Sequence, residues 1–181
     1  IISGDLIFQD QALTSLDLPE LETVEGDILI ADNHDLVDVT LSSLETVGGT
    51  IRIDANDELT TLSLPALRTA GGLYADGCDA FETIDAPDLT ALEQGLSLEY
   101  LPDLRDLDGL GSLTSARNLF LFNLHALRSI EGLSNLTDIE TTVYIQHNDC
   151  LSDAEVDAFI ANLDPDVDAV PYDNGDDYPC P

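Results

Sequence analysis

The chain has no lysine, no methionine and no tryptophan, and only five of its 181 residues are basic, all of them arginine. Against these stand 37 acidic residues, which give a formal net charge of −32 at pH 7. Binding to nucleic acid needs a basic patch that displaces counterions from the phosphates, and an anionic membrane surface repels so acidic a protein. We therefore expect no nucleic acid partner and no direct membrane insertion.

Long hydrophobic runs are missing as well. No 18 consecutive apolar residues occur, so no segment is predicted to span a membrane as a helix. No signal peptide pattern is present, and because the chain starts abruptly at Ile1 we expect an upstream segment to have been removed. Hydrophobic residues still make up 44% of the chain, which is too much for a disordered acidic tail. The sequence thus indicates a folded body with an acidic surface.

A repeat runs through most of the chain. Pairs of apolar residues separated by one residue recur every 22 to 24 positions, and the first members are Leu6, Ile28, Ile51, Leu73, Leu96, Leu119 and Val143. A second apolar column keeps the same period at Leu13, Leu36, Leu59, Phe81, Leu104, Leu127 and Leu151. Several columns in phase over six or seven repeats indicate a stacked repeat architecture.

A single repeat unit can bury its apolar side chains only against neighbouring units. The columns therefore predict continuous rows of apolar side chains inside a stack of coils. The alternation within each apolar pair predicts a short strand, and the strands of successive coils are expected to pair in parallel. We predict an all-β parallel β-solenoid of about seven coils over residues 1–151. A helix in every repeat is the competing interpretation, but the connecting segments are rich in threonine and interrupted by proline, which favours extended pieces.

Glycines near the predicted coil corners are expected to adopt a positive φ or to allow close backbone approach. They are Gly26, Gly49, Gly72, Gly95 and Gly132.

Residues 152–181 differ from the repeats. The segment Ser152-Asp-Ala-Glu155 matches a capping box, and the apolar residues after it follow helical spacing, which predicts an amphipathic helix over residues 153–163. An acidic, proline-containing tail completes the chain. A terminal unit of this kind covers the open end of a solenoid, whereas the N-terminal end shows no matching cap.

The three cysteines are expected to form one disulfide. Cys78 and Cys150 lie three coils apart, about 14 Å at ~4.8 Å per coil, whereas a disulfide spans Cα separations only up to ~7 Å. We therefore predict a Cys150–Cys180 bond, with Cys78 a buried free thiol. Such a bond implies an oxidising compartment.

The repeat unit Leu-x-x-Leu-x-Leu-Pro-x-Leu-x-Thr-Val-x-Gly-x-Ile-x-Ile-x-x-Asn, best seen over residues 13–33 and again over 36–56, resembles the receptor L domain. That family is related to leucine-rich repeats, and it includes secreted and lipid-anchored bacterial surface proteins. The resemblance implies a right-handed solenoid that binds or scaffolds, without shared catalytic residues. It also implies a secreted or cell-surface location, with lipid anchoring through an upstream segment as one route.

Side chains that point outward from the predicted sheet form the candidate site. A solvent-facing strand normally carries polar residues, so an apolar and aromatic patch indicates a binding surface, although such residues also simply favour strands. The candidate ligand-binding residues are Arg52, Asp54, Tyr74, Asp76, Glu99, Phe120, Phe122 and Tyr144. We expect them to recognise a protein or a glycan at the cell surface.

The acidic row Asp54, Asp76 and Glu99 also permits a polysaccharide-active enzyme, because glycosidases use paired carboxylates for acid and base chemistry. Acidic residues are common throughout this chain, so we favour a solvated acidic face and predict no enzymatic activity and no catalytic residues. A weak calcium site in the tail is conceivable at the acids of 164–168 and 173–177, which lack the spacing of the twelve-residue calcium loop. We assign no metal ligands and no cofactor.

The first alternative to a binding module is a self-assembling subunit, and it ranks ahead of the enzyme. The first predicted coil presents an uncovered side, and a bare strand edge is a template for another chain. The sequence therefore allows a homo-oligomer formed through the N-terminal coil, with a two-fold dimer as the simplest closed arrangement.

Overall fold

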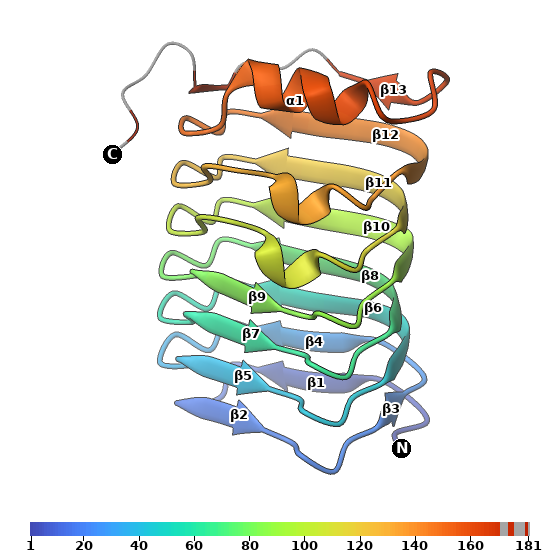
Figure 1. Cartoon of the computed structure of the whole chain (residues 1–181). Coiled ribbons are helices and arrows are strands. Elements are labelled where there is room, and N and C mark those ends of the chain that lie inside the picture. The colour runs from blue at the N-terminus through green and yellow to red at the C-terminus, as the bar shows by residue number, and fades with distance from the viewer. Residues whose placement is uncertain (171–173, 176–179, 181) are drawn as a thin grey trace.

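The computed structural model describes residues 1–170, 174, 175 and 180, and it shows a parallel β-solenoid (Figure 1). The chain climbs through about seven coils, with one short helix near the C-terminus. In Figure 1 the near strands run left to right and the far strands run right to left as the chain rises, which makes the coil right-handed. The predicted fold class is confirmed.

Among the described residues, the larger sheet, sheet A, has nine strands that all pair in parallel. Its main path is β1 (Leu6–Gln9), β4 (Ile28–Ala31), β6 (Thr46–Asp54), β8 (Thr69–Asp76), β10 (Ala91–Glu99), β11 (Ser115–Phe122), β12 (Asp138–Gln146) and β13 (Asp168–Ala169), and β3 (Thr23–Val24) pairs beside it with β6. The long strands shift register midway, for example between Val47 and Thr50, so each long strand bends around one side of the coil.

The opposite side of the coil changes along the solenoid. In the first four coils it forms sheet B, made of β2 (Ser15–Asp17), β5 (Asp38–Thr40), β7 (Thr61–Ser63) and β9 (Thr83–Asp85). The next two coils replace the strand with 3-10 turns, η1 (Asp108–Leu110) and η2 (Glu131–Leu133). The expectation of extended segments therefore holds for four coils. In the fifth and sixth coils an acid-Gly-Leu sequence allows a tight turn instead.

The C-terminal helix α1 spans Asp153–Ile160 and lies over the last coil (Figure 1). The Ser152 side chain caps it by accepting a hydrogen bond from the Glu155 backbone N–H. The predicted helix over 153–163 is three residues too long, because the backbone turns at Ala161 and Leu163 packs into the core from a turn. The Cys150–Cys180 disulfide is present, with a Cα–Cα distance of 4.8 Å, and Cys78 is a buried free thiol.

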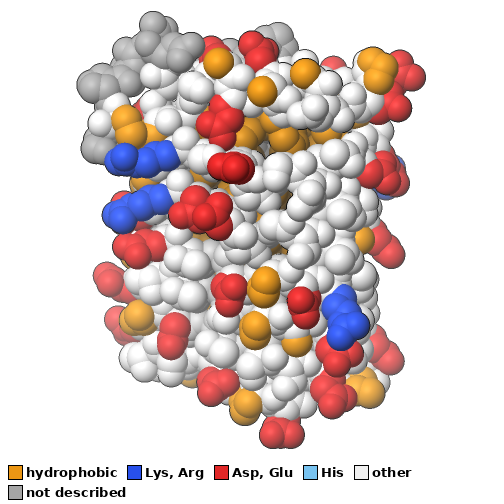
Figure 2. Space-filling model, viewed as in Figure 1, with side chains coloured by type: hydrophobic (Ala, Val, Ile, Leu, Met, Phe, Trp, Pro, Cys, Tyr) orange, Lys and Arg blue, Asp and Glu red, His pale blue; other side chains and the backbone are white. Residues whose placement is uncertain are grey.

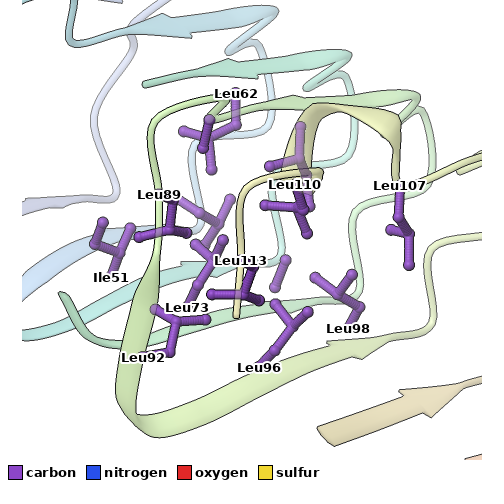
Figure 3. Close-up of a cluster of buried hydrophobic side chains, with 14 of the residues drawn as sticks. Ile51, Leu62, Leu73, Leu89, Leu92, Leu96, Leu98, Leu107, Leu110 and Leu113 are labelled. Atoms are coloured by element: carbon purple, nitrogen blue, oxygen red, sulfur yellow. The ribbon is translucent and has the colours of Figure 1, made fainter. Parts of the chain in front are cut away.

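The repeated apolar columns fill the interior. Figure 3 shows leucines from neighbouring coils pointing toward one another inside the solenoid, among them Leu73, Leu96 and Leu98 from sheet A and Leu107 and Leu110 from the opposite side. The buried residues form one continuous cluster along the whole stack. The apolar residues of the first coil are only partly buried, because one side of that coil has no neighbour among the described residues.

Each coil leaves sheet A through a residue with positive φ. These residues are Asp10, Asp32, Ala55, Gly77, Tyr100, Asn123 and His147, with φ between 51° and 56° in the non-glycine members and Gly77 at 62°. The expected corner glycines are mostly elsewhere: of those named above, only Gly95 has a positive φ. Gly26, Gly49, Gly72 and Gly132 instead allow close approach, because an added Cβ would collide with atoms of another coil or of Tyr74.

After three of these corners, at Asn33, Asn56 and Asn148, a buried asparagine ties adjacent coils together. Asn33 and Asn56 are fully buried, and the Nδ2 of Asn33 donates to the Oδ1 of Asn56 across 3.2 Å. Each asparagine also donates to backbone carbonyls of its own and the preceding coil. Asn148 and Asn174 repeat the arrangement beneath the cap. These ladders satisfy backbone groups that the corners would otherwise leave unpaired.

Candidate functional site

Two outward columns on sheet A contain all eight candidate binding residues. The first column places Arg52 of β6 beside Tyr74 of β8, and continues through Ser97 to Phe120 and Tyr144. The second column runs through Asp54, Asp76, Glu99 and Phe122. Neighbouring strands in a sheet lie ~4.8 Å apart, so each residue is directly adjacent to the next in its column. The structure therefore brings the predicted set together on one face.

The acidic half of this face is a shallow depression of about 340 Å³. It is lined by Arg52, Asp54, Tyr74, Ala75, Asp76, Ser97, Glu99, Asn118 and Phe120. At one end Arg52 forms an ion pair with Asp54, with both Nε and Nη2 3.2 Å from Oδ2. The other carboxylate oxygen of Asp54, Oδ1, is buried without a hydrogen-bond donor among the described residues.

Negative charge accumulates along the second column. Partial burial, followed by the neighbouring charges of Glu99 and Asp54, raises the pKa of Asp76 above its ordinary value, while Arg52 opposes the shift. Glu99 accepts a hydrogen bond of 2.7 Å from the Ser97 hydroxyl. In the first column, burial raises the pKa of the Tyr74 hydroxyl, so that group stays protonated and can donate. The depression thus combines three carboxylates with one guanidinium.

The aromatic half of the face begins where the acidic half ends. Phe120, which lines the depression, lies 5.8 Å from Tyr144 between ring centroids, and Phe122 lies 5.9 Å from Tyr144. Two corner residues extend this cluster: Tyr100 packs edge-on against Phe122 at 5.4 Å, and His147 does so at 5.3 Å. Aromatic pairs favour offset or edge-to-face geometry, and the contacts of Phe122 with Tyr100 and His147 are edge-to-face. We name the five residues Tyr100, Phe120, Phe122, Tyr144 and His147 the aromatic cluster.

Several members of the site are absent from the eight candidates predicted from the sequence, among them Tyr100, Asn118 and His147. Tyr100 and His147 occupy the positive-φ corner that follows β10 and β12, and the 23-residue period alone would have placed them beside the second column. Asn118 lines the depression and covers Gly95, where the side-chain amide fills the space of a missing Cβ. Asn118 meets Gly95 where the pairing of β10 with β11 shifts register, between Leu92 and Leu96, and the repeat pattern does not indicate this shift.

On the face shown in Figure 2, acidic side chains are scattered over the surface and basic side chains are few. A second hollow, of about 370 Å³, lies between α1 and η2 and is lined by Ile130, Leu136, Phe159 and polar neighbours. Figure 2 shows hydrophobic atoms gathered beneath the helix in this region. Glu155 connects α1 to the solenoid, because its carboxylate accepts hydrogen bonds from the Ser129 hydroxyl and the Ile130 backbone N–H. This hollow is part of the junction between cap and solenoid.

In the described part of the chain, no group of three histidine, cysteine or acidic side chains is placed to hold a metal ion. In the first of the two acidic tail segments, the Asp164 carboxylate accepts a hydrogen bond from the Asp166 backbone N–H instead. Most of the second segment, including Asp173, Asp176 and Asp177, lies outside the described residues. Within those same described residues, no helix has the length and apolar character needed to cross a membrane.

Comparison of the chain with protein-family models, with curated proteins and with solved structures found no match. The fold and the geometry of the sheet A face are therefore the basis of the functional argument that follows.

Proposed function

We propose that this protein is a non-catalytic binding module of the cell surface or extracellular space, of the receptor L domain type, which recognises a protein or a glycan through the outward face of sheet A. One observation carries this proposal: the depression and the aromatic cluster form one continuous surface. Phe120 belongs to both. Aromatic residues beside a polar hollow are typical of interface centres, where they provide most of the binding energy.

The cysteine pairing supports an extracellular location. A disulfide such as Cys150–Cys180 persists in oxidising compartments and is rare in the cytosol. The high negative charge keeps such a protein soluble and separate from other acidic surfaces. The repeat unit and its asparagines, in turn, are the features on which the resemblance to the receptor L domain rests.

The double variant Phe120→Ser/Tyr144→Ser tests the proposal on a glycan array and on a displayed peptide library. Both rings are only half-buried, so the fold should survive. Val37→Ser is the matched control, because Val37 is 44% exposed and lies in a connecting segment away from sheet A. We expect ligands bound by the native protein to bind the double variant at least ten-fold more weakly and the control unchanged. Equal binding by all three proteins would overturn the proposal.

The carboxylates of the depression are also those that glycosidic hydrolysis would use, since Asp76 has a raised pKa and lies beside two other carboxylates. A screen of polysaccharides for released reducing ends tests this alternative. Release that is lost in Asp76→Asn would make the protein an enzyme and overturn the non-catalytic proposal.

A second candidate function, self-assembly, is favoured by the N-terminal end. Strand β1 pairs with β4 on one side and has no partner strand on the other side among the described residues. Leu6, Phe8 and Leu13 are only partly buried there. Pairing of two such edges would bury these side chains and satisfy the free backbone groups. Light scattering over a range of concentrations tests it, and a mass equal to one chain throughout would overturn it.

A further inference from the structure

The sheet A face carries a more specific indication of its partner than the class of protein or glycan. Resting on the proposed binding function, we propose that this face docks a polypeptide segment that has an arginine or lysine side chain about four residues from an aromatic or large apolar side chain. The basic group would enter the depression, and the apolar group would cover the aromatic cluster.

Unbalanced charge in the depression is the first argument. Arg52 is paired with Asp54. Among the described residues, neither Asp76 nor Glu99 forms an ion pair, although each lies next to another carboxylate in the column. Three carboxylates and one guanidinium leave a local charge of about −2. A cationic partner is complementary to this surface, and an anionic one is repelled.

Hydrogen-bonding capacity is the second argument. The carboxylates of Asp54, Asp76 and Glu99, which line the depression, offer acceptor oxygens only. A guanidinium or an ammonium group carries donors and no acceptor, so each of its N–H groups can donate to a carboxylate oxygen of this surface. A neutral sugar hydroxyl brings an acceptor with every donor and no charge. The carboxylates are also not gathered around a single metal position in the part of the chain that the structure describes.

The adjoining aromatic rings are the third argument. Phe120 forms the wall of the depression nearest to the aromatic cluster, so a guanidinium held by Asp76 and Glu99 would lie beside a ring face or edge. Arginine binds aromatic rings by cation–π attraction as well as by stacking. Beyond Phe120, the rings of Phe122 and Tyr144 offer apolar area without further charge.

Coil spacing sets the distance between the two parts of the partner. From Asp76 on β8 to the midpoint between β11 and β12 is two and a half strand spacings, or about 12 Å at ~4.8 Å each. An extended polypeptide advances ~3.3 Å per residue, so about four residues cover that distance. The expected segment therefore runs along the solenoid axis, across the strands of sheet A.

The test uses a blocked heptapeptide with the sequence Gly-Arg-Gly-Ser-Gly-Trp-Gly, titrated into isotopically labelled protein and followed by NMR. We expect the backbone signals of Asp76, Glu99, Phe120 and Tyr144 to shift most. Three comparison peptides replace the arginine with citrulline, replace the tryptophan with glycine, or place the two residues side by side. Each is expected to bind at least five-fold more weakly.

Matched protein variants separate specific binding from general attraction to an acidic protein. Asp76→Asn/Glu99→Gln removes two charges from the depression, whereas Asp17→Asn/Asp38→Asn removes two exposed charges from sheet B. We expect the first variant to bind the arginine peptide at least ten-fold more weakly, and the second to bind it within two-fold of the native protein. Equal weakening in both variants, or equal binding of the citrulline peptide, would overturn the inference.

The same experiment distinguishes this inference from the function on which it rests. If a glycan binds the sheet A face and loses affinity in Phe120→Ser/Tyr144→Ser, while the arginine peptide does not bind, the proposed function stands and the basic-segment inference falls. If neither a glycan nor any peptide shifts signals on sheet A, both fall.

Discussion

The backbone N–H of Asn56 donates a hydrogen bond to the Sγ of Cys78 across 3.4 Å, between two successive coils. The thiol in turn lies 3.6 Å from the carbonyl of Asp76 and 3.8 Å from that of Ile53. Cys78 therefore takes the position that Asn33 and Asn56 hold in the preceding coils. Burial raises the pKa of the Cys78 thiol to about 11, so it stays protonated and remains a donor.

This relationship predicts the effect of replacing the thiol. Cys78→Ala leaves the buried Asn56 N–H without an acceptor, which should lower the free energy of unfolding by about 1–3 kcal/mol. Cys78→Asn restores an acceptor and two donors, as in Asn56, and should be more stable than the alanine variant. Urea unfolding measures both. An alanine variant as stable as the native protein would contradict the bridging role of Cys78.

The disulfide should matter mainly for the cap. Cys150 and Cys180 are 30 residues apart, so closing that loop restricts the unfolded chain and stabilises the folded state by about 3–4 kcal/mol. Replacing both cysteines with serine should remove this contribution, lowering the midpoint of urea unfolding while α1 exchanges its amide hydrogens faster. Hydrogen exchange of the β6 and β8 amides serves as the internal control. Uniform loss of protection along the solenoid would show that cap and coils unfold as one unit.

The positive-φ corners predict that two substitutions change the free energy of unfolding in opposite directions. Ala55 has a φ of 51°, a conformation that asparagine and glycine adopt more easily than alanine. Ala55→Asn should therefore raise the free energy of unfolding by about 0.5–1 kcal/mol, while Gly77→Ala, at φ 62°, should lower it by about 1 kcal/mol. Thermal unfolding of the two variants checks the prediction. Changes of the same sign would be inconsistent with corner strain.

The raised pKa of Asp76 predicts that the stability of the folded protein depends on pH. Its pKa is raised in the folded protein, first by partial burial and then by Glu99 and Asp54, so the ionised form is less favourable in the folded than in the unfolded state. Asp76→Asn should thus melt at a higher temperature than the native protein at pH 7. The difference should shrink as the pH falls through the raised pKa, and it should vanish below the ordinary value of 3.8, where both states are protonated. A difference independent of pH would contradict this account.

Two glycines at the 3-10 turns differ in the space around them, so the same substitution should destabilise the protein at Gly132 and not at Gly111. An added Cβ at Gly132 would collide with the Leu107 carbonyl of the preceding coil, whereas one at Gly111 would meet only the Asp108 carbonyl at 3.4 Å, an ordinary contact. Gly132→Ala should lower the free energy of unfolding by about 1–3 kcal/mol, within the range of overpacked sites, and Gly111→Ala should change it little. Equilibrium unfolding of the two variants measures the difference, and similar values for both would refute close coil contact at Gly132.

The repeat period alone is enough to predict the stacking of the coils. A period of 22 to 24 residues with several apolar columns in phase has one compact solution, in which each column packs on its copy in the next coil. The same period placed Arg52 beside Tyr74 and Asp54 beside Asp76, because residues at equal positions in parallel strands become neighbours. It also placed the disulfide, since coil spacing prevents Cys78 from reaching Cys150.

Tertiary structure decided what the period leaves open. The register shift between β10 and β11, where Asn118 lies against Gly95, depends on how each coil packs on its neighbour. The positive φ falls on residues such as Ala55 and Tyr100, because the corner geometry is imposed by stacking and overrides local preference. The burial that raises the pKa of Asp76 likewise exists only once β6, β8 and β10 are paired. Local sequence does not encode these features, since each is a property of contacts between coils.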